Sequence, residues 1–375
     1  MESIPLFTTV LGNEEINSVI ETMKSGNIGT GNKTELFESD FAKYIGVKHA
    51  IGMDSCTNSL HLALRGLGIG PGDEVITTPL TFVATVNSIL YTGAIPVFAD
   101  IDPNTLNISP LSIEKKITSK TKAILPVHIY GNPCDMDEIL EIAKLNKLKI
   151  VSDCAHAIEA EYKGQKVGNL GDAACFSFYA TKNLTTGNGG MLVTNDKNLA
   201  EYCRIVRDHG MAAGAWSRYQ TGEMQHFEMV ELGYKCIMWD VQASIGFNQL
   251  KLLEERNIKR QKIAERYQSA FSENEKIELL QIDNNNKHAF HMYVIKLLNL
   301  DRDLIATEIE KRGVSVGVHY RPVHLEPYYA NKFPDNIGKF PIAEAMGAKI
   351  LTLPIWPDLS HELQQRVIDV VQEAL

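Results

Sequence analysis

Between Lys48 and Asp196 the chain alternates short apolar runs with longer amphipathic stretches, and this alternation constrains the fold more than any other feature. Runs such as residues 123–127 are apolar at consecutive positions rather than at every second one. Strands of this kind are buried on both faces, as in a mostly parallel sheet covered by helices on both sides. The pattern predicts an α/β fold with a mostly parallel seven-stranded sheet. Its strands are expected at residues 48–54, 75–79, 95–101, 121–129, 148–153, 172–179 and 190–195.

The alternation of short apolar runs and amphipathic stretches ends near residue 240. Helical stretches are expected earlier at 59–67, 83–91 and 136–146, the last one capped by Asp135. A long charged helix is then expected at 241–271. We therefore predict a large domain at residues 1–245 and a smaller α+β domain at 246–375. The smaller domain combines strand-like segments at 289–297 and 314–318 with helical segments at 304–311 and 361–374.

Charge and cysteine content exclude several classes of protein. The chain has 37 basic and 46 acidic residues, a net charge of −9, and no run of Lys or Arg, so neither nucleic acid nor a membrane is an expected partner. Residues 75–99 are uncharged, but Pro79, Gly93 and Pro96 argue against a membrane span. No signal peptide is recognised at the N-terminus. The six cysteines form no Cys-x-x-Cys pair, which favours free thiols in the cytoplasm and no metal site.

Polar residues follow four of the predicted strands, where ligands bind in open parallel sheets. The turn at residues 54–59 enters a helix, and its hydroxyls and backbone N–H groups suit a phosphate, although an ordinary helix cap would look the same. Asp153 ends a buried strand and needs a cationic or amide partner. Lys182 follows another strand, where partial burial would make its amine nucleophilic, although most lysines are simply solvated. Phe82 follows a fourth strand and alone would be assigned to the core.

Together these four features describe one ligand. A phosphate at a helix N-terminus, a planar ring against Phe82, a ring nitrogen facing Asp153 and an aldehyde meeting Lys182 correspond to pyridoxal phosphate. A dinucleotide site is not supported, because the glycines at 68–72 precede a strand instead of following one. Serine-nucleophile and metal-hydrolase interpretations each explain only one element.

The same residues resemble the DegT/DnrJ/EryC1/StrS family of sugar aminotransferases, which have the fold of type I pyridoxal-phosphate transferases. The resemblance runs through most of the chain and includes the segments at 25–31, 70–76, 81–85, 97–103, 126–128, 177–190 and 319–324. It implies that Lys182 bonds covalently to the cofactor, that Asp153 pairs with the ring nitrogen and that Phe82 stacks on the ring. Cofactor contacts are also implied for Cys56, Thr57, Asn58, His156, Ser177 and Lys235.

The resemblance also implies a substrate class and an assembly. Lys235 would reach the cofactor of a second subunit, so a homodimer with shared active sites is expected. The segments 215–218, 233–235 and 319–321 look most like enzymes that aminate a UDP-linked 4-keto pentose, with L-glutamate as amino donor. Substrate contacts are expected from Thr30, Tyr179, Arg218, His319, Tyr320 and Arg321.

Two alternatives remain open from the sequence. The same chemistry could act on a small phosphorylated ketone or a cyclitol, because Arg321, Arg218 and Lys235 could equally serve a single phosphate. A regulator that binds the cofactor without catalysis is the other, although retained Lys182 and Asp153 would then have no purpose. His288 and His291 flank an apolar strand and are expected to be structural, although the resemblance places the nearby loop at the active site.

Overall fold

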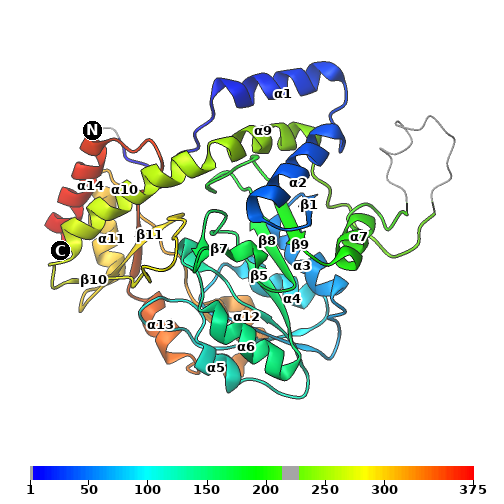
Figure 1. The fold of residues 1–375 in the computed structure, drawn as a ribbon. Helices are drawn as coiled ribbons and strands as arrows, with labels where there is room; N and C mark the ends of the chain where they lie inside the picture. Colours follow the sequence, from blue (N-terminus) through cyan, green and yellow to red (C-terminus); the bar gives the residue numbers. More distant parts are fainter. Residues whose placement is uncertain (1–2, 213–227) are drawn as a thin grey trace.

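The computed structural model describes residues 3–212 and 228–375, and its centre is a seven-stranded sheet (Figure 1). The strand order is β1-β9-β8-β5-β4-β2-β3, and all seven predicted strands are confirmed. Neighbouring strands run parallel from β8 to β3, whereas β9 is antiparallel to both β1 and β8. The strands are β1 His49–Met53, β2 Glu74–Thr77, β3 Ile95–Phe98, β4 Thr121–Leu125, β5 Lys149–Asp153, β8 Ala173–Ser177 and β9 Gly190–Thr194.

Helices cover both faces of this sheet, as expected for strands that are apolar on both faces. One buried cluster joins the sheet to α3, α4 and α7, and a second joins the opposite face to α2, α5, α6 and α9. Each helix therefore buries one apolar stripe against the strands. The bounds are α2 Asn32–Ile45, α3 Cys56–Gly66, α4 Val83–Tyr91, α5 Pro110–Glu114, α6 Met136–Asn146, α7 Lys197–Val206 and α9 Asp240–Lys251.

A second, antiparallel sheet has its own buried cluster. Its strand order is β10-β11-β12, and the apolar faces of α10, α11 and α14 pack with it, together with Ile4 from the N-terminal segment. A small β6-β7 hairpin, the helices α1, α12 and α13 and four short 3-10 helices complete the part of the chain that the structure describes. The bounds are α1 Asn13–Ser25, β6 Glu161–Tyr162, β7 Gln165–Lys166, α10 Leu253–Phe271, β10 Ile277–Leu279, β11 Tyr293–Leu297, α11 Arg302–Lys311, α12 Pro327–Lys332, α13 Pro341–Gly347, β12 Ile350–Leu353 and α14 His361–Ala374.

Two local expectations were wrong, and a third was met only in part. The long helix is interrupted at Leu252, which lets Leu253 become fully buried while Leu252 stays partly exposed. The segment 314–318 forms only isolated bridges, to Ile4 and Thr352, and no ladder. Asp135 is the N-cap residue of α6, as expected, but its carboxylate accepts from the Tyr162 hydroxyl at 2.9 Å and makes no capping hydrogen bond. The proposed boundary at residue 245 falls inside α9, and the division into two domains stays a prediction.

The described residues hold no disulfide and no clustered metal ligands. All six cysteines are buried and free. Residues 3–212 and 228–375 contain no group of three or more His, Cys, Asp or Glu side chains placed to hold a metal ion. In the same part of the chain no helix combines the length and the apolar character needed to cross a membrane.

Candidate active site

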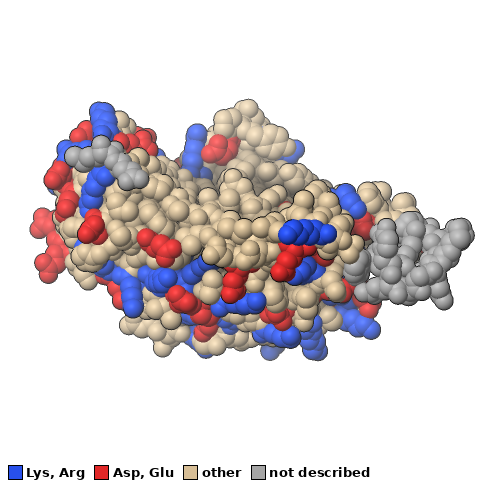
Figure 2. Space-filling view, turned by 90° about the horizontal axis from the view of Figure 1, so that it is seen from above, with Lys and Arg blue, Asp and Glu red and all other residues tan. Residues whose placement is uncertain are grey.

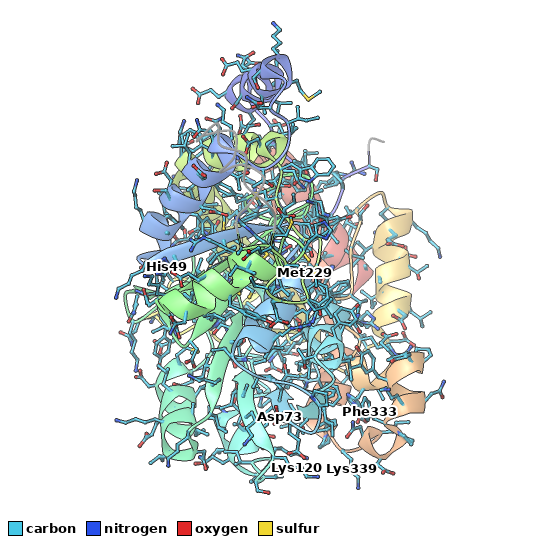
Figure 3. The ribbon with its side chains drawn as sticks, turned by 90° about the vertical axis from the view of Figure 1, so that its right-hand side faces the viewer. His49, Asp73, Lys120, Met229, Phe333 and Lys339 are labelled. Atoms are coloured by element: carbon cyan, nitrogen blue, oxygen red, sulfur yellow. The ribbon has the colours of Figure 1, made fainter. Side chains whose placement is uncertain are left out.

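A cavity of about 400 Å³ lies where β5 and β8 end and where α3 and α4 begin. A larger hollow of about 850 Å³ lies between α4 and α12 and is lined by Phe333, labelled in Figure 3, but it contains none of the predicted site residues. We therefore place the candidate site in the smaller cavity. Ten of the predicted site residues line it, namely Cys56, Thr57, Phe82, Asp153, His156, Ser177, Tyr179, Lys182, His319 and Tyr320.

Lys182 follows β8 by five residues, in a turn held by its backbone N–H on the Tyr179 carbonyl at 2.9 Å. Its Nζ lies 3.3 Å from Nε2 of His291. Burial lowers the pKa of the amine to about 8, against the opposing effect of Asp153. A useful fraction of the amine is therefore neutral and nucleophilic near neutral pH.

Asp153 is the last residue of β5 and is almost completely buried. Its Oδ1 accepts from the Ala155 backbone N–H at 3.0 Å, and its Oδ2 accepts from the Thr85 hydroxyl at 2.8 Å. Burial raises the pKa of this carboxyl, while these two hydrogen bonds and Lys182 oppose the rise. A cationic N–H group placed against the carboxylate would favour its ionised form further.

His156 and Tyr320 form a hydrogen-bonded pair on one wall. His156 Nδ1 accepts from the Tyr130 backbone N–H at 3.2 Å, and its Nε2 lies 3.2 Å from the Tyr320 hydroxyl. Burial holds the pKa of His156 well below its usual value, so the ring is neutral. Because Nδ1 is an acceptor, the proton sits on Nε2 and is donated to Tyr320. The Tyr320 proton is then free to point to a bound molecule.

The N-terminus of α3 forms one wall of the cavity. The Ser55 hydroxyl accepts from the Asn58 N–H at 3.2 Å, and the first-turn N–H groups of an α-helix have no acceptor within the helix. Gly190 pairs with both Met53 and Ser177, and its Cα lies against the backbone of Ser55 and Cys56. A positive helix end beside a buried acid and a partly neutral lysine fits a phosphorylated pyridine aldehyde.

Four of the predicted residues that the structure describes are not brought into the cavity. Asn58 donates its side-chain N–H to Asp54 Oδ1 at 2.8 Å, and Thr30 donates to the Met238 carbonyl at 2.6 Å. Lys235 forms an exposed ion pair with Asp208 at 2.8 Å. Arg321 is exposed and does not line the cavity, and Arg218 lies outside the described residues.

Several site residues were missed from the sequence. Thr81 and Thr85 form a pair of hydroxyls 2.8 Å apart that leads to Asp153. His291, which was expected to be structural, lies against Lys182 instead. The signal for Thr85 was available, since it lies in the first turn of α4, directly after Phe82. For His291 the only signal was the resemblance, which places the nearby loop at the site. Phe7, Leu60, Ala84, Val127, Thr181, Asn188, Gly189 and Met292 also line the cavity.

This strand order, with a lysine and an acid at the strand ends, defines a pyridoxal-phosphate transferase of fold type I. The chain belongs to the DegT/DnrJ/EryC1/StrS aminotransferase family, whose pattern matches residues 9–372. It is therefore an aminotransferase, and pyridoxal phosphate is its cofactor.

Relatives of known name support this assignment over the whole length. The spore coat polysaccharide biosynthesis protein SpsC of Bacillus subtilis is 44% identical over 99% of this chain and 96% of its own. The structure of DesV from S. venezuelae is 35% identical, covers 100% of this chain and 98% of its own, and has a TM-score of 0.92. The putative sugar aminotransferase Spr1654 of Streptococcus pneumoniae, in its pyridoxamine-phosphate form, is 32% identical, covers 99% and 100%, and has a TM-score of 0.93.

Proposed function

We propose that this protein transfers an amino group from an amino acid, L-glutamate, to the keto group of a nucleotide-linked sugar in polysaccharide or amino-sugar biosynthesis. The observation that carries the proposal is the joint placement of Lys182, Asp153 and the α3 N-terminus around one cavity. The likeness to SpsC and to a solved sugar aminotransferase supports a sugar as acceptor.

Each residue has a task in this proposal. Bound pyridoxal phosphate supplies an aldehyde that bonds to amines and a protonated ring that withdraws electrons from the neighbouring carbon. Lys182 holds the cofactor at rest, and its freed amine then removes and returns a proton beside that carbon. Asp153 keeps the ring nitrogen protonated, and Phe82, exposed at the cavity edge, covers the ring. The α3 N-terminus and Ser177 bind the phosphate.

We also propose a homodimer with shared active sites. The described part of the chain exposes several large apolar side chains on α1 and near α9, among them Ile16, Ile20, Met23 and Trp239, each more than 40% exposed. A broad band without charged side chains crosses the face seen from above in Figure 2, the side on which α1 and α9 lie in Figure 1. Ile16, Ile20 and Met23 recur at helical spacing on one face of α1, and an exposed apolar helix face of this kind is typical of a protein interface. Lys235 would reach the second subunit by leaving Asp208.

The catalytic assignment is tested by colour and by one substitution. The purified protein should absorb in the visible range of a lysine imine, and Lys182→Ala should remove this band and all turnover while the fold is retained. A wild-type protein that stays colourless with added pyridoxal phosphate would refute the role of Lys182.

The acceptor is tested separately. The pyridoxamine-phosphate form should return to the aldehyde spectrum when the correct keto substrate is added, and 2-oxoglutarate should appear when L-glutamate restores it. A panel of UDP-linked and dTDP-linked keto-sugars, a small phosphorylated ketone and a keto-cyclitol covers the alternatives. A response only to the last two compounds would replace the nucleotide sugar in the proposal.

A further inference from the structure

A chain of polar side chains leads from Lys182 into the protein interior. Lys182 Nζ lies 3.3 Å from His291 Nε2, and His291 Nδ1 lies 3.2 Å from Asn183 Oδ1. Asn183 Nδ2 in turn donates to Glu159 Oε1 at 2.9 Å. His291, Asn183 and Glu159 are all buried, so the three side chains cannot exchange these partners for water.

The outer members of this chain fix the tautomer of His291. Asn183 Nδ2 also donates to the Ala289 carbonyl at 2.9 Å, and a carbonyl oxygen can only accept. The amide nitrogen of Asn183 therefore faces Ala289 and Glu159, and its oxygen faces His291. An oxygen acceptor at that position requires an N–H on Nδ1 of His291. In the neutral ring the lone pair of Nε2 then points to Lys182, which must be the donor.

The ring of His291 is held in this orientation from other sides as well. Phe7 stacks on it with a centroid distance of 6.0 Å and an interplanar angle of 12°, and the His156 ring lies 4.6 Å away. His291 is 1% exposed, and burial together with Lys182 keeps its pKa well below the usual value. The ring is therefore a neutral, fixed acceptor.

Several other groups near Lys182 also influence the pKa of its amine. Asp153 and Cys56 favour the charged amine, and burial disfavours it. The remaining neighbours are rings that burial keeps neutral, namely His156, His291 and His319. Of these, His291 is hydrogen-bonded to Nζ, so its removal should change the amine specifically.

We propose that His291 is a positioning residue for Lys182: whenever the amine is not bonded to the cofactor, His291 Nε2 accepts a hydrogen from Nζ and holds the amine at the cavity wall, while Asn183 and Glu159 fix the required tautomer. This inference rests on the proposed role of Lys182. It goes beyond that role because it assigns a function to three buried residues behind the cavity.

The test measures the pKa of Lys182 in the pyridoxamine-phosphate form, where the amine is free. Lysine side chains labelled with ¹³C at Cε are titrated by NMR, and the resonance of Lys182 is assigned by its loss in Lys182→Ala. His291→Leu should lower the pKa of Lys182 by about one unit, because the ammonium form loses a hydrogen-bond acceptor. His291→Gln supplies an amide oxygen and should restore most of the wild-type value.

A matched control lies three residues away. His288 is also buried, but its Nδ1 accepts from the Phe290 backbone N–H at 2.7 Å, and it does not line the cavity that Lys182 lines. His288→Leu should leave the pKa of Lys182 unchanged. The proposal is overturned if His291→Leu leaves this pKa unchanged or if His288→Leu lowers it equally.

A second measurement is made on the wild-type protein, and a variant serves only to assign the resonance. Histidine-selective ¹⁵N NMR of the wild-type pyridoxamine-phosphate form should show the proton of His291 on Nδ1, with the resonance assigned by its loss in His291→Gln. A proton on Nε2 would overturn the proposal, because Nε2 could not then accept from Lys182. Neither result depends on the imine band of Lys182, so a failure here is distinct from a failure of the proposed function.

Discussion

Gly190 and Ser55 are in such close contact that a Cβ atom on Gly190 would stand 2.3 Å from the Ser55 carbonyl carbon. The same atom would lie 2.5 Å from the Cys56 backbone nitrogen. Because both neighbours are backbone atoms, no side-chain rotation can relieve the overlap. The glycine at the start of β9 therefore allows the N-terminus of α3 to reach the cavity.

Gly190→Ala should consequently displace the α3 N-terminus and weaken cofactor binding. Overpacking of this kind costs about 1–3 kcal/mol, and we expect the dissociation constant for pyridoxal phosphate to rise by about tenfold or more. Titration of the imine absorbance measures this constant. Gly29→Ala is the control, because a Cβ there meets nothing within 4 Å and its φ is not positive, so it should bind the cofactor normally.

Thr85→Val should weaken the cofactor site through Asp153. The Thr85 hydroxyl donates to Asp153 Oδ2 at 2.8 Å, and its loss removes one of the bonds that keep the pKa of this buried carboxyl from rising further. An unsatisfied buried acceptor costs about 1–3 kcal/mol, so cofactor affinity should fall about tenfold.

The control for this substitution is Thr77→Val. Thr77 is equally buried and donates to the Leu125 carbonyl at 2.8 Å, so its replacement also removes a buried hydroxyl hydrogen bond. It should lower the free energy of unfolding to a similar extent but leave cofactor affinity unchanged. Equal loss of affinity in both variants would mean that Thr85 acts only on stability.

The sequence was sufficient to predict the sheet and the central pair of site residues. Strands buried on both faces carry a continuous apolar signal, and polar residues that interrupt it at strand ends are conspicuous, as Asp153 and Lys182 are. The antiparallel direction of β9 has no such signal, because a strand reads the same in both directions.

Contacts between distant segments could not be predicted. His291 lies 109 positions from Lys182, and its role depends on the amide orientation of Asn183, which only the packed structure fixes. Asn58 is an error of the opposite kind, since a cofactor contact was expected and the structure does not show it. The side chain of Asn58 lies at the start of a helix but is hydrogen-bonded to Asp54 and does not enter the cavity. Residue type shows that a side chain can bind a phosphate but not which way it points.

Ile20→Glu should weaken the proposed dimer. Ile20 is 44% exposed on α1, which stands at the upper edge of the molecule in Figures 1 and 3. Burying a new carboxylate without a partner is costly, and the dimer dissociation constant should rise by about 100-fold. Sedimentation velocity over a dilution series measures this change. Leu145→Glu, at an even more exposed position on α6, should leave the assembly unchanged, and a monomeric wild type would refute the dimer itself.

The buried acid Glu159 should give the stability of the cofactor-free protein a characteristic pH dependence. Burial raises the pKa of Glu159 from 4.5 to about 7, although Arg260 and Asn183 oppose the rise. Between these two values the folded protein holds a proton that the unfolded chain has released. Stability from this group is therefore complete below about pH 4.5 and is lost as the pH rises through about 7.

Glu159→Gln should remove this dependence, because the amide resembles the protonated acid and keeps an oxygen that accepts from Asn183. The free energy of unfolding, obtained from urea titrations, should be similar for the two proteins near the lower end of this range. Above about pH 7 the variant should be the more stable protein by about 1 kcal/mol or more, since the wild type must then bury a charge. If the difference in the free energy of unfolding between the two proteins stays constant across the range, Glu159 does not titrate between pH 4.5 and about 7. The carboxyl of Glu159 would then not hold a proton in the folded protein near neutral pH.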